Sequence, residues 1–277
     1  MEQTKLQELK RIAANVRLGA LECVYSAASG HPGGALSIAD ILTYLYFEHM
    51  HIDPKNPTWS ERDRFVLSKG HTCPALYAVL AEKGYFPKED LKTFRQIDSY
   101  LQGHPDMKQT PGVDMTSGSL GLGISAACGM ALSGKIDRKT YRVYSILGDG
   151  EVEEGQVWEA AMFAAHYQLD NLCAFVDVNG LQIDGPTEKV MNSAPLRDKF
   201  RAFGWHTIDI DGHDFEQIAA ALQEAGQTVG QPTMILAKCV KGKGVSFMEN
   251  QVGWHGKAPK QEEYEQAVAE IKAAAGL

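Results

Sequence analysis

The sequence lacks the features that would place the chain at a membrane or on a nucleic acid. No apolar stretch is long enough to span a bilayer, and the first residues, MEQTKLQELKR, lack the apolar core of a signal peptide. No run of basic residues occurs, and the formal net charge of -8 argues against a nucleic-acid groove. We therefore expect a cytoplasmic protein with neither a membrane nor a nucleic acid as its partner.

Cysteine is scarce and unpatterned. The five cysteines are scattered, odd in number and form no CxxC pair, which argues against a zinc site or a disulfide framework and favours reduced thiols in the core. Hydrophobic residues, by contrast, make up 44% of the 277 residues. A chain of this length and composition can bury a substantial core, in one large α/β domain or two small ones.

Apolar runs alternate with segments of helical periodicity along the chain. Five such runs occur, at residues 64–68, 142–147, 172–178, 206–210 and 233–239. Because most are separated by helix-like segments, the pattern predicts an α/β fold with a parallel sheet flanked by helices on both faces. A glycine-containing loop and an amphipathic helix over 262–275 close the chain, which we read as one domain over residues 1–277.

The most informative stretch runs from Tyr141 to Leu181. An apolar run breaks at the sequence GDG, residues 148–150, a helix-like segment follows, and a second apolar run ends at Asn179. This pattern predicts a strand-helix-strand unit. Its polar residues would lie at the carboxyl ends of both strands, where open parallel sheets bind their ligands.

Asp149 and Asn179 bring oxygen ligands to that edge. A carboxylate, an amide oxygen and a free backbone carbonyl are ligands that Mg²⁺ prefers when phosphate groups complete its shell. Taken alone, GDG and Asn-Gly are each more typical of a sharp turn. Their pairing across one strand-helix-strand unit favours a metal site.

Two other glycine motifs compete for a nucleotide. Residues 121–126, GLGISA, match a dinucleotide-binding pattern, but no strand precedes them. Residues 129–135, GMALSGK, resemble a phosphate-binding loop, but Ile136 stands where Ser or Thr is needed and the helical pattern continues. We interpret the region instead as a glycine-rich turn whose N–H groups face an anion at the start of a helix over 122–132.

Two histidines lie at predicted turns. His31 sits in a glycine- and proline-rich bend between two helices, the second starting just past the glycines, where an ordinary loop histidine is the alternative. His71 lies between a short strand and a helix. At that carboxyl end of a strand, a neutral imidazole can donate to a phosphate oxygen.

These motifs resemble the transketolase family of thiamine-diphosphate enzymes. GDGEVEEGQVWEAAMFA with FVDVNGLQIDG carries the resemblance, and SGHPGG, DRFVLSKGH, TSGSLGLG and WHGK follow the family's order over about residues 5 to 260. The resemblance implies thiamine diphosphate and Mg²⁺, or Ca²⁺ or Mn²⁺ in its place, as cofactors. It also implies that Asp149, Asn179 and the carbonyl of Leu181 bind the metal.

The resemblance assigns further roles. It implies that His31, His104 and His255 act on the substrate or in proton transfer, and that Glu154 lies at a subunit contact. The implied cofactor-binding residues are His71, Gly118, Ser119, Leu120, Gly150, Glu154, Asn179, Lys241 and His255. In one departure, Gly34 supplies no side-chain contact at a position where members of the family vary.

The family's usual polypeptide is more than twice as long and includes a pyrimidine-binding domain, whose glutamate activates the cofactor, and a C-terminal domain. We therefore expect a split transketolase, in which this N-terminal subunit pairs with a separate C-terminal subunit to form an α2β2 assembly. The expected reaction is two-carbon ketol transfer between sugar phosphates. Alternatives are ketol transfer on a modified or sulfonated sugar, and a non-catalytic cofactor-binding module.

Overall fold

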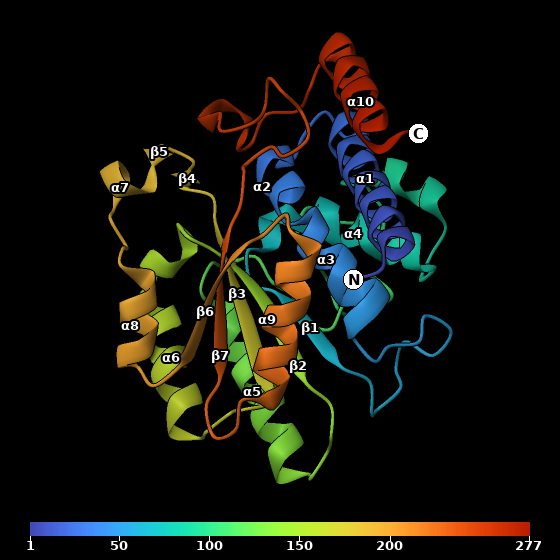
Figure 1. The fold of residues 1–277 in the computed structure, drawn as a ribbon. Helices are drawn as coiled ribbons and strands as arrows, with labels where there is room; N and C mark the ends of the chain where they lie inside the picture. The colour runs from blue at the N-terminus through green and yellow to red at the C-terminus, as the bar shows by residue number, and fades with distance from the viewer.

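The computed structural model describes residues 1–277 and contains a five-stranded parallel sheet between two layers of helices (Figure 1). Each strand comes from one of the five apolar runs, so the expected fold class is confirmed. The strands lie in the order β1-β2-β3-β7-β6. Their bounds are β1 (Arg64–Leu67), β2 (Val143–Gly148), β3 (Leu172–Val178), β7 (Thr233–Lys238) and β6 (His206–Asp211).

The central strands are buried on both faces, which explains why their sequences are almost continuously apolar. Successive side chains of a strand point to opposite faces. Thus Tyr144 and Ile146 of β2 pack in one core cluster, whereas Val143 and Leu147 pack in the other. A parallel sheet needs both of its faces covered, and the helices supply that cover.

Different helices cover the two faces. The helices on one face are α2 (Pro32–Ser37), α3 (Ala39–Tyr44), α4 (Cys73–Lys83) and α9 (Phe215–Gln227), and α1 (Gln3–Ser26) packs against α2, α3 and α4. The other packs against α5 (Leu122–Ile136), α6 (Gly155–His166) and α8 (Leu196–Ala202). The C-terminal helix α10 (Gln261–Ala275) lies along α1 and closes a third, smaller core cluster (Figure 1).

Short elements complete the connections. A π-helical turn occurs at Leu45–His49, and tight 3₁₀ turns occur at Gly70–Thr72, Lys88–Thr93, Glu151–Glu153 and Val252–Trp254. After β3 the chain forms a small antiparallel hairpin of β4 (Leu181–Gln182) and β5 (Gly185–Pro186), followed by α7 (Thr187–Val190). The sequence did not predict this hairpin because two-residue strands have no periodicity.

The bend around His31 differs from the sequence prediction. Helix α2 begins at Pro32 and includes the glycines, because proline fits the first turn of a helix. Gly34 is needed there for close packing: a Cβ at this position would lie 2.7 Å from Thr72 Cγ2. The predicted second helix is in fact two short helices, α2 and α3, that meet at Ile38.

The two rejected nucleotide motifs have structural explanations. Residues 129–135 lie within α5, so their N–H groups are used by helix hydrogen bonds and cannot wrap a phosphate. No strand stands directly before Gly121, which has a φ of 82°, ends a long loop and immediately precedes α5. Both observations agree with setting these motifs aside.

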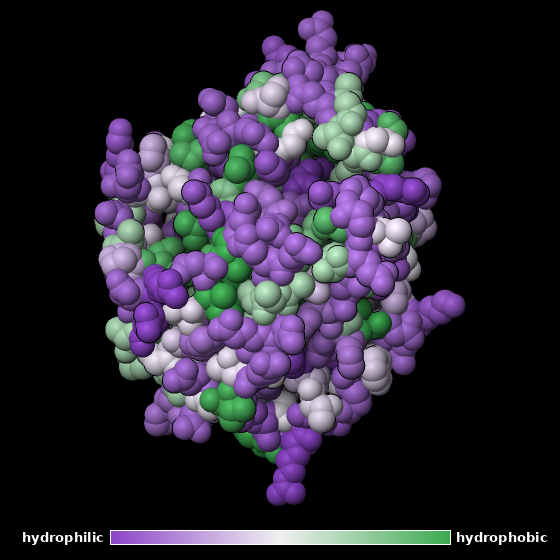
Figure 2. Space-filling view, in the orientation of Figure 1, coloured by the Kyte–Doolittle hydropathy of each residue, from purple (hydrophilic) through white to green (hydrophobic).

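The surface is that expected for a chain whose apolar residues lie inside. The face of the molecule shown in Figure 2 is mostly hydrophilic, with smaller hydrophobic patches between. None of the helices combines the length and the apolar character needed to cross a bilayer.

Candidate cofactor and metal site

A cavity of about 630 Å³ opens at the carboxyl ends of β2 and β3. Its position agrees with the rule that open parallel sheets bind ligands at this edge. Most of the residues implicated by the sequence line it: His71, Gly118, Leu120, Asp149, Gly150, Glu154, Asn179, Leu181, Lys241 and His255. Three others, His31, His104 and Ser119, do not line it.

Asp149 is a buried carboxylate without a cationic partner. It follows β2 directly and is 4% exposed. Its two oxygens accept from the backbone N–H groups of Gly150 (2.9 Å) and Gly180 (2.5 Å). Burial, and next the charge of Asp177, raise the pKa of Asp149 to about 6. A bound cation would supply the countercharge that this carboxylate lacks.

Asn179 and Leu181 present their oxygens close by, in the turn after β3. Asn179 Oδ1 accepts from the Leu181 N–H (3.1 Å), and Asn179 Nδ2 donates to Asp177 (2.9 Å). The Leu181 carbonyl accepts from the ammonium of Lys241 (3.0 Å). A positive charge therefore already lies against one of the expected metal ligands.

The residues present suit a hard cation. No three His, Cys, Asp or Glu side chains gather anywhere in the chain as a metal-binding group. Asp149, Asn179 and Leu181 instead offer one carboxylate, one amide and one backbone carbonyl oxygen, a set suited to Mg²⁺ or Ca²⁺ rather than to a soft metal. With a divalent cation bound, this set would leave sites for phosphate oxygens.

Lys241 connects this oxygen set to a histidine. Its side chain is 2% exposed, and Nζ lies 2.8 Å from His255 Nδ1. Burial, and next the charge of Lys69, lower the pKa of Lys241 to about 8. The lysine therefore remains mostly charged at pH 7 and is placed to attract an anion in the cavity.

Three histidines pack together beside Lys241. The ring centroids of His31 and His71 are 5.0 Å apart, those of His71 and His255 5.3 Å, and those of His31 and His255 5.5 Å. Burial is the main cause that lowers the pKa of each: to about 4 for His31, to about 3 for His255, and well below its usual range for His71. All three are therefore neutral at pH 7 and can donate or accept a hydrogen bond.

The implicated residues that do not line the cavity lie at its margins. His31 reaches the cavity only through the rings of His71 and His255, and its Nδ1 is buried without a hydrogen-bond partner. The ring of His104 packs beside Gly118, and its pKa is lowered by burial and by Arg95. Ser119 is exposed, and its carbonyl accepts from the Leu122 N–H (3.3 Å).

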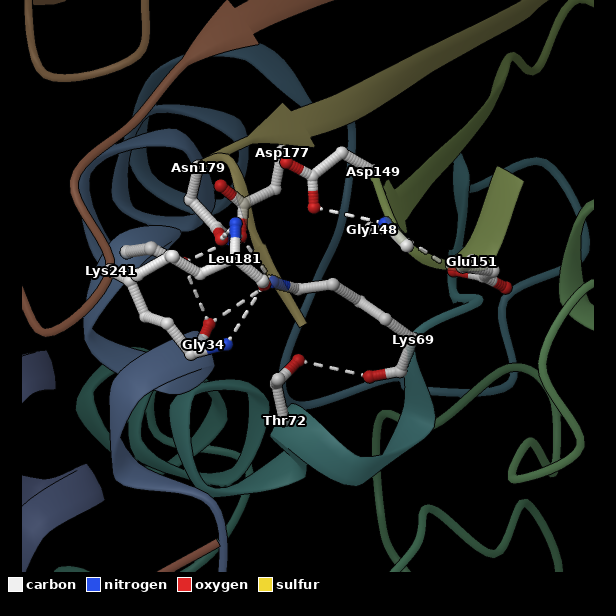
Figure 3. Close-up of polar contacts among 12 residues, drawn as sticks. Gly34, Lys69, Thr72, Gly148, Asp149, Glu151, Asp177, Asn179, Leu181 and Lys241 are labelled. Carbon is white, nitrogen blue, oxygen red and sulfur yellow. Dashed lines mark hydrogen bonds and ion pairs between the residues drawn. The ribbon is translucent and has the colours of Figure 1, made fainter. Parts of the chain in front are cut away.

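Sequence reasoning missed two buried charges at the cavity, where Lys69 is one of the lining residues. Lys69 and Asp177 are paired, and Lys69 also donates to the Gly34 carbonyl (3.1 Å) (Figure 3). A signal was available for both. Asp177 interrupts an otherwise apolar run two residues before Asn179, and Lys69 comes two residues before His71. A charge inside a buried strand requires a partner.

Glu151 is a third missed residue, and it shapes the glycine loops around the cavity. Glu151 is 2% exposed. Its carboxylate accepts hydrogen bonds from Ser68 Oγ (2.5 Å) and from the N–H groups of Gly121 (2.8 Å) and Gly148 (3.0 Å). It therefore joins the start of α5 to the end of β2. The sequence GDGE places it next to the metal motif, but only the fold shows that it points inward.

Comparison with known proteins agrees with this geometry. The family model described as transketolase, thiamine diphosphate binding domain, matches residues 8–277. The chain is 50% identical, over 96% of each chain, to the 6-deoxy-6-sulfo-D-fructose transketolase subunit of a Clostridium species. It is 43% identical to one of the subunits of the apulose-4-phosphate transketolase of Phocaeicola vulgatus, over 91% of this chain and 89% of that one.

A solved structure supports the same family. The transketolase of Campylobacter jejuni is 34% identical and superposes with a TM-score of 0.91, covering 100% of this chain. The match covers only 43% of the Campylobacter chain. The chain therefore spans nearly the full length of the two subunit relatives and less than half of that transketolase.

Proposed function

The chain belongs to the transketolase family, as its thiamine diphosphate-binding domain, and we propose that it is the N-terminal subunit of a two-chain transketolase. The proposed reaction is reversible two-carbon ketol transfer from a ketose phosphate to an aldose phosphate. The observation that carries the proposal is the cavity itself, which gathers Asp149, Asn179, the Leu181 carbonyl and His255 at one edge of the sheet.

The cofactor would be held by its diphosphate. Asp149, Asn179 and the Leu181 carbonyl would bind a divalent cation, and Mg²⁺ suits this oxygen set best when phosphate oxygens complete its shell. His71, Lys241 and backbone N–H groups near Gly118 to Leu120 would contact the diphosphate oxygens, and Gly150, which has no side chain, would let the backbone come close to them. When bound, thiamine diphosphate supplies the carbanion stabilisation that a ketol transfer needs.

The neutral histidines would handle the sugar. A neutral imidazole can donate a hydrogen bond to one hydroxyl and take a proton from another, whereas an imidazolium can only donate. The lowered pKa values of His31, His104 and His255 keep all three imidazoles neutral at pH 7. Proton transfer at the substrate hydroxyls is therefore assigned to these three.

A partner chain would complete the site. The Clostridium and Phocaeicola relatives are both named as subunits, and the chain matches nearly their full length, which supports the same arrangement here. The partner would supply the pyrimidine-binding domain and its activating acid. Two pairs would form an α2β2 assembly with Glu154, exposed at the cavity rim, at a subunit contact.

Reconstitution tests the proposal. The chain is purified alone and with C-terminal transketolase subunits, and ketol transfer is assayed with thiamine diphosphate and Mg²⁺. We expect activity only when both chains are present, and its loss in the His255→Asn variant. Robust transfer by the lone chain would refute the two-chain proposal. Cofactor binding without activity under any pairing would favour a non-catalytic module.

A second substrate class is supported by one specific comparison. The 50% identical relative is named for 6-deoxy-6-sulfo-D-fructose, so a sulfonated ketose is the alternative donor to a ketose phosphate. A substrate panel on the reconstituted pair decides between them. Comparable kcat/KM for both donors would mean that the assembly does not discriminate between sulfonate and phosphate.

A further inference from the structure

Asp177 lies behind the candidate metal ligands and bonds to three elements of the fold. It is fully buried near the end of β3. Its Oδ2 accepts from Ser37 Oγ at the end of α2 (2.6 Å), from Asn179 Nδ2 (2.9 Å) and from the ammonium of Lys69, just after β1. Figure 3 shows Lys69 reaching across to Asp177 from the opposite side of the cluster.

This network fixes which end of the Asn179 amide faces Asp177. A carboxylate paired with an ammonium can only accept hydrogen bonds, so the amide atom 2.9 Å from Asp177 is the NH₂ group. The Leu181 N–H can only donate, so the atom 3.1 Å from it is the amide oxygen. Both contacts select the same orientation and leave the oxygen turned away from Asp177.

We propose that Asp177 is a positioning residue that, neutralised by Lys69, locks the Asn179 amide with its oxygen available to the bound cation. The inference rests on the proposed function, in which Asn179 is a metal ligand. Without an acceptor at position 177, the amide can rotate and present its NH₂ group, which repels a cation. Partners behind metal ligands have this effect in general, and their loss typically lowers metal affinity about 10- to 100-fold.

Lys69 supplies the positive charge that balances the buried Asp177 carboxylate. A carboxylate buried in the sheet would be costly without a countercharge, and the Lys69 ammonium supplies it while also holding the Gly34 carbonyl (3.1 Å). The pair therefore ties α2, β1 and β3 together behind the cavity. Removing both charges at once should leave the fold intact, because buried ion pairs can be replaced by uncharged residues of similar volume.

The test compares two nearly isosteric residues at one position. In a Lys69→Met background, Asp177→Asn keeps an oxygen that can accept from the Asn179 amide, whereas Asp177→Leu does not. The probe is Mn²⁺, whose binding is titrated by electron paramagnetic resonance, and thermal unfolding in EDTA checks the fold. We expect the leucine variant to bind Mn²⁺ about 10- to 100-fold more weakly than wild type, and the asparagine variant to recover most of that loss.

An ion pair on the surface provides the matched control. Lys139→Met with Glu61→Gln removes that pair and should leave Mn²⁺ affinity unchanged. If the leucine variant does not fold, Asp177→Ala in the same background replaces it. Equal Mn²⁺ affinity in the folded asparagine and leucine or alanine variants overturns the inference while leaving the metal site in place. Absence of Mn²⁺ binding by the wild-type chain overturns the metal site itself.

Discussion

Binding of a divalent cation should weaken as the pH falls through about 6, because Asp149 must lose its proton before it can bind a cation. The pKa of this carboxyl is raised to about 6, first by burial and then by Asp177. At pH 5 only about a tenth of the carboxyls would be ionised. The apparent affinity for Mn²⁺ should therefore be about tenfold lower than at pH 7, or about 1.4 kcal/mol.

The histidines and the lysine beside Asp149 do not titrate in this window. The pKa values of His31 and His255 are lowered to about 4 and about 3, and that of His71 is lowered well below its usual range, so all three stay neutral between pH 5 and 7. The pKa of Lys241, about 8, keeps its ammonium charged over the same range. Of these groups only Asp149 should change its charge in this window, and we expect it to set the midpoint.

The same shift affects stability, and its sign follows from linkage. The folded chain holds the Asp149 proton more tightly than the unfolded chain does, because the pKa rises from 3.8 to about 6 on folding. This contribution to stability is fully present below pH 3.8 and is lost as the pH rises through about 6. The loss for Asp149 is on the order of 3 kcal/mol. Bound cation offsets it, so Mn²⁺ should raise the melting temperature more at pH 7 than at pH 5.

Two measurements check this reasoning. Mn²⁺ binding is titrated by electron paramagnetic resonance at pH 5, 6 and 7, and melting is followed with and without Mn²⁺ at each pH. The histidines contribute stability that is lost as the pH falls below about 6.5, so only the difference made by Mn²⁺ is compared. An affinity that is the same at pH 5 and 7, or a midpoint near pH 4, would refute the argument.

Three further predictions concern glycines of α5 and two residues that line the cavity. Gly123→Ala should destabilise the chain by more than 1 kcal/mol, because a Cβ there would lie 2.5 Å from Ser68 Cα. Gly129→Ala, on the same helix but in open space, should instead stabilise the chain by about 0.5–1 kcal/mol. Urea unfolding measures both changes. His255→Asn should leave the melting temperature within a few degrees while lowering ketol transfer by the reconstituted pair about 100-fold or more. Lys241→Met should weaken thiamine diphosphate binding in calorimetry at least tenfold, because it removes a charge buried at the cavity; unchanged affinity would remove this lysine from the site.

Local patterns in the sequence were sufficient to predict the layers of the fold. The five apolar runs became the five strands because a parallel sheet buried on both faces needs almost continuous apolar residues. The GDG and Asn-Gly breaks predicted where β2 and β3 end, since glycine and asparagine interrupt a strand. For the same reason, the positions of Asp149 and Asn179 at one edge of the sheet were predictable before the structure was known.

Only the tertiary structure decided how distant segments meet. The strand order β1-β2-β3-β7-β6 depends on which strands pair across long loops, and no local period encodes that choice. The pairing of Lys69 with Asp177, 108 positions apart, and the packing of His31, His71 and His255 arise in the same way. A sequence pattern records which face of its own element a residue occupies, whereas the identity of its partner is decided when the elements pack together.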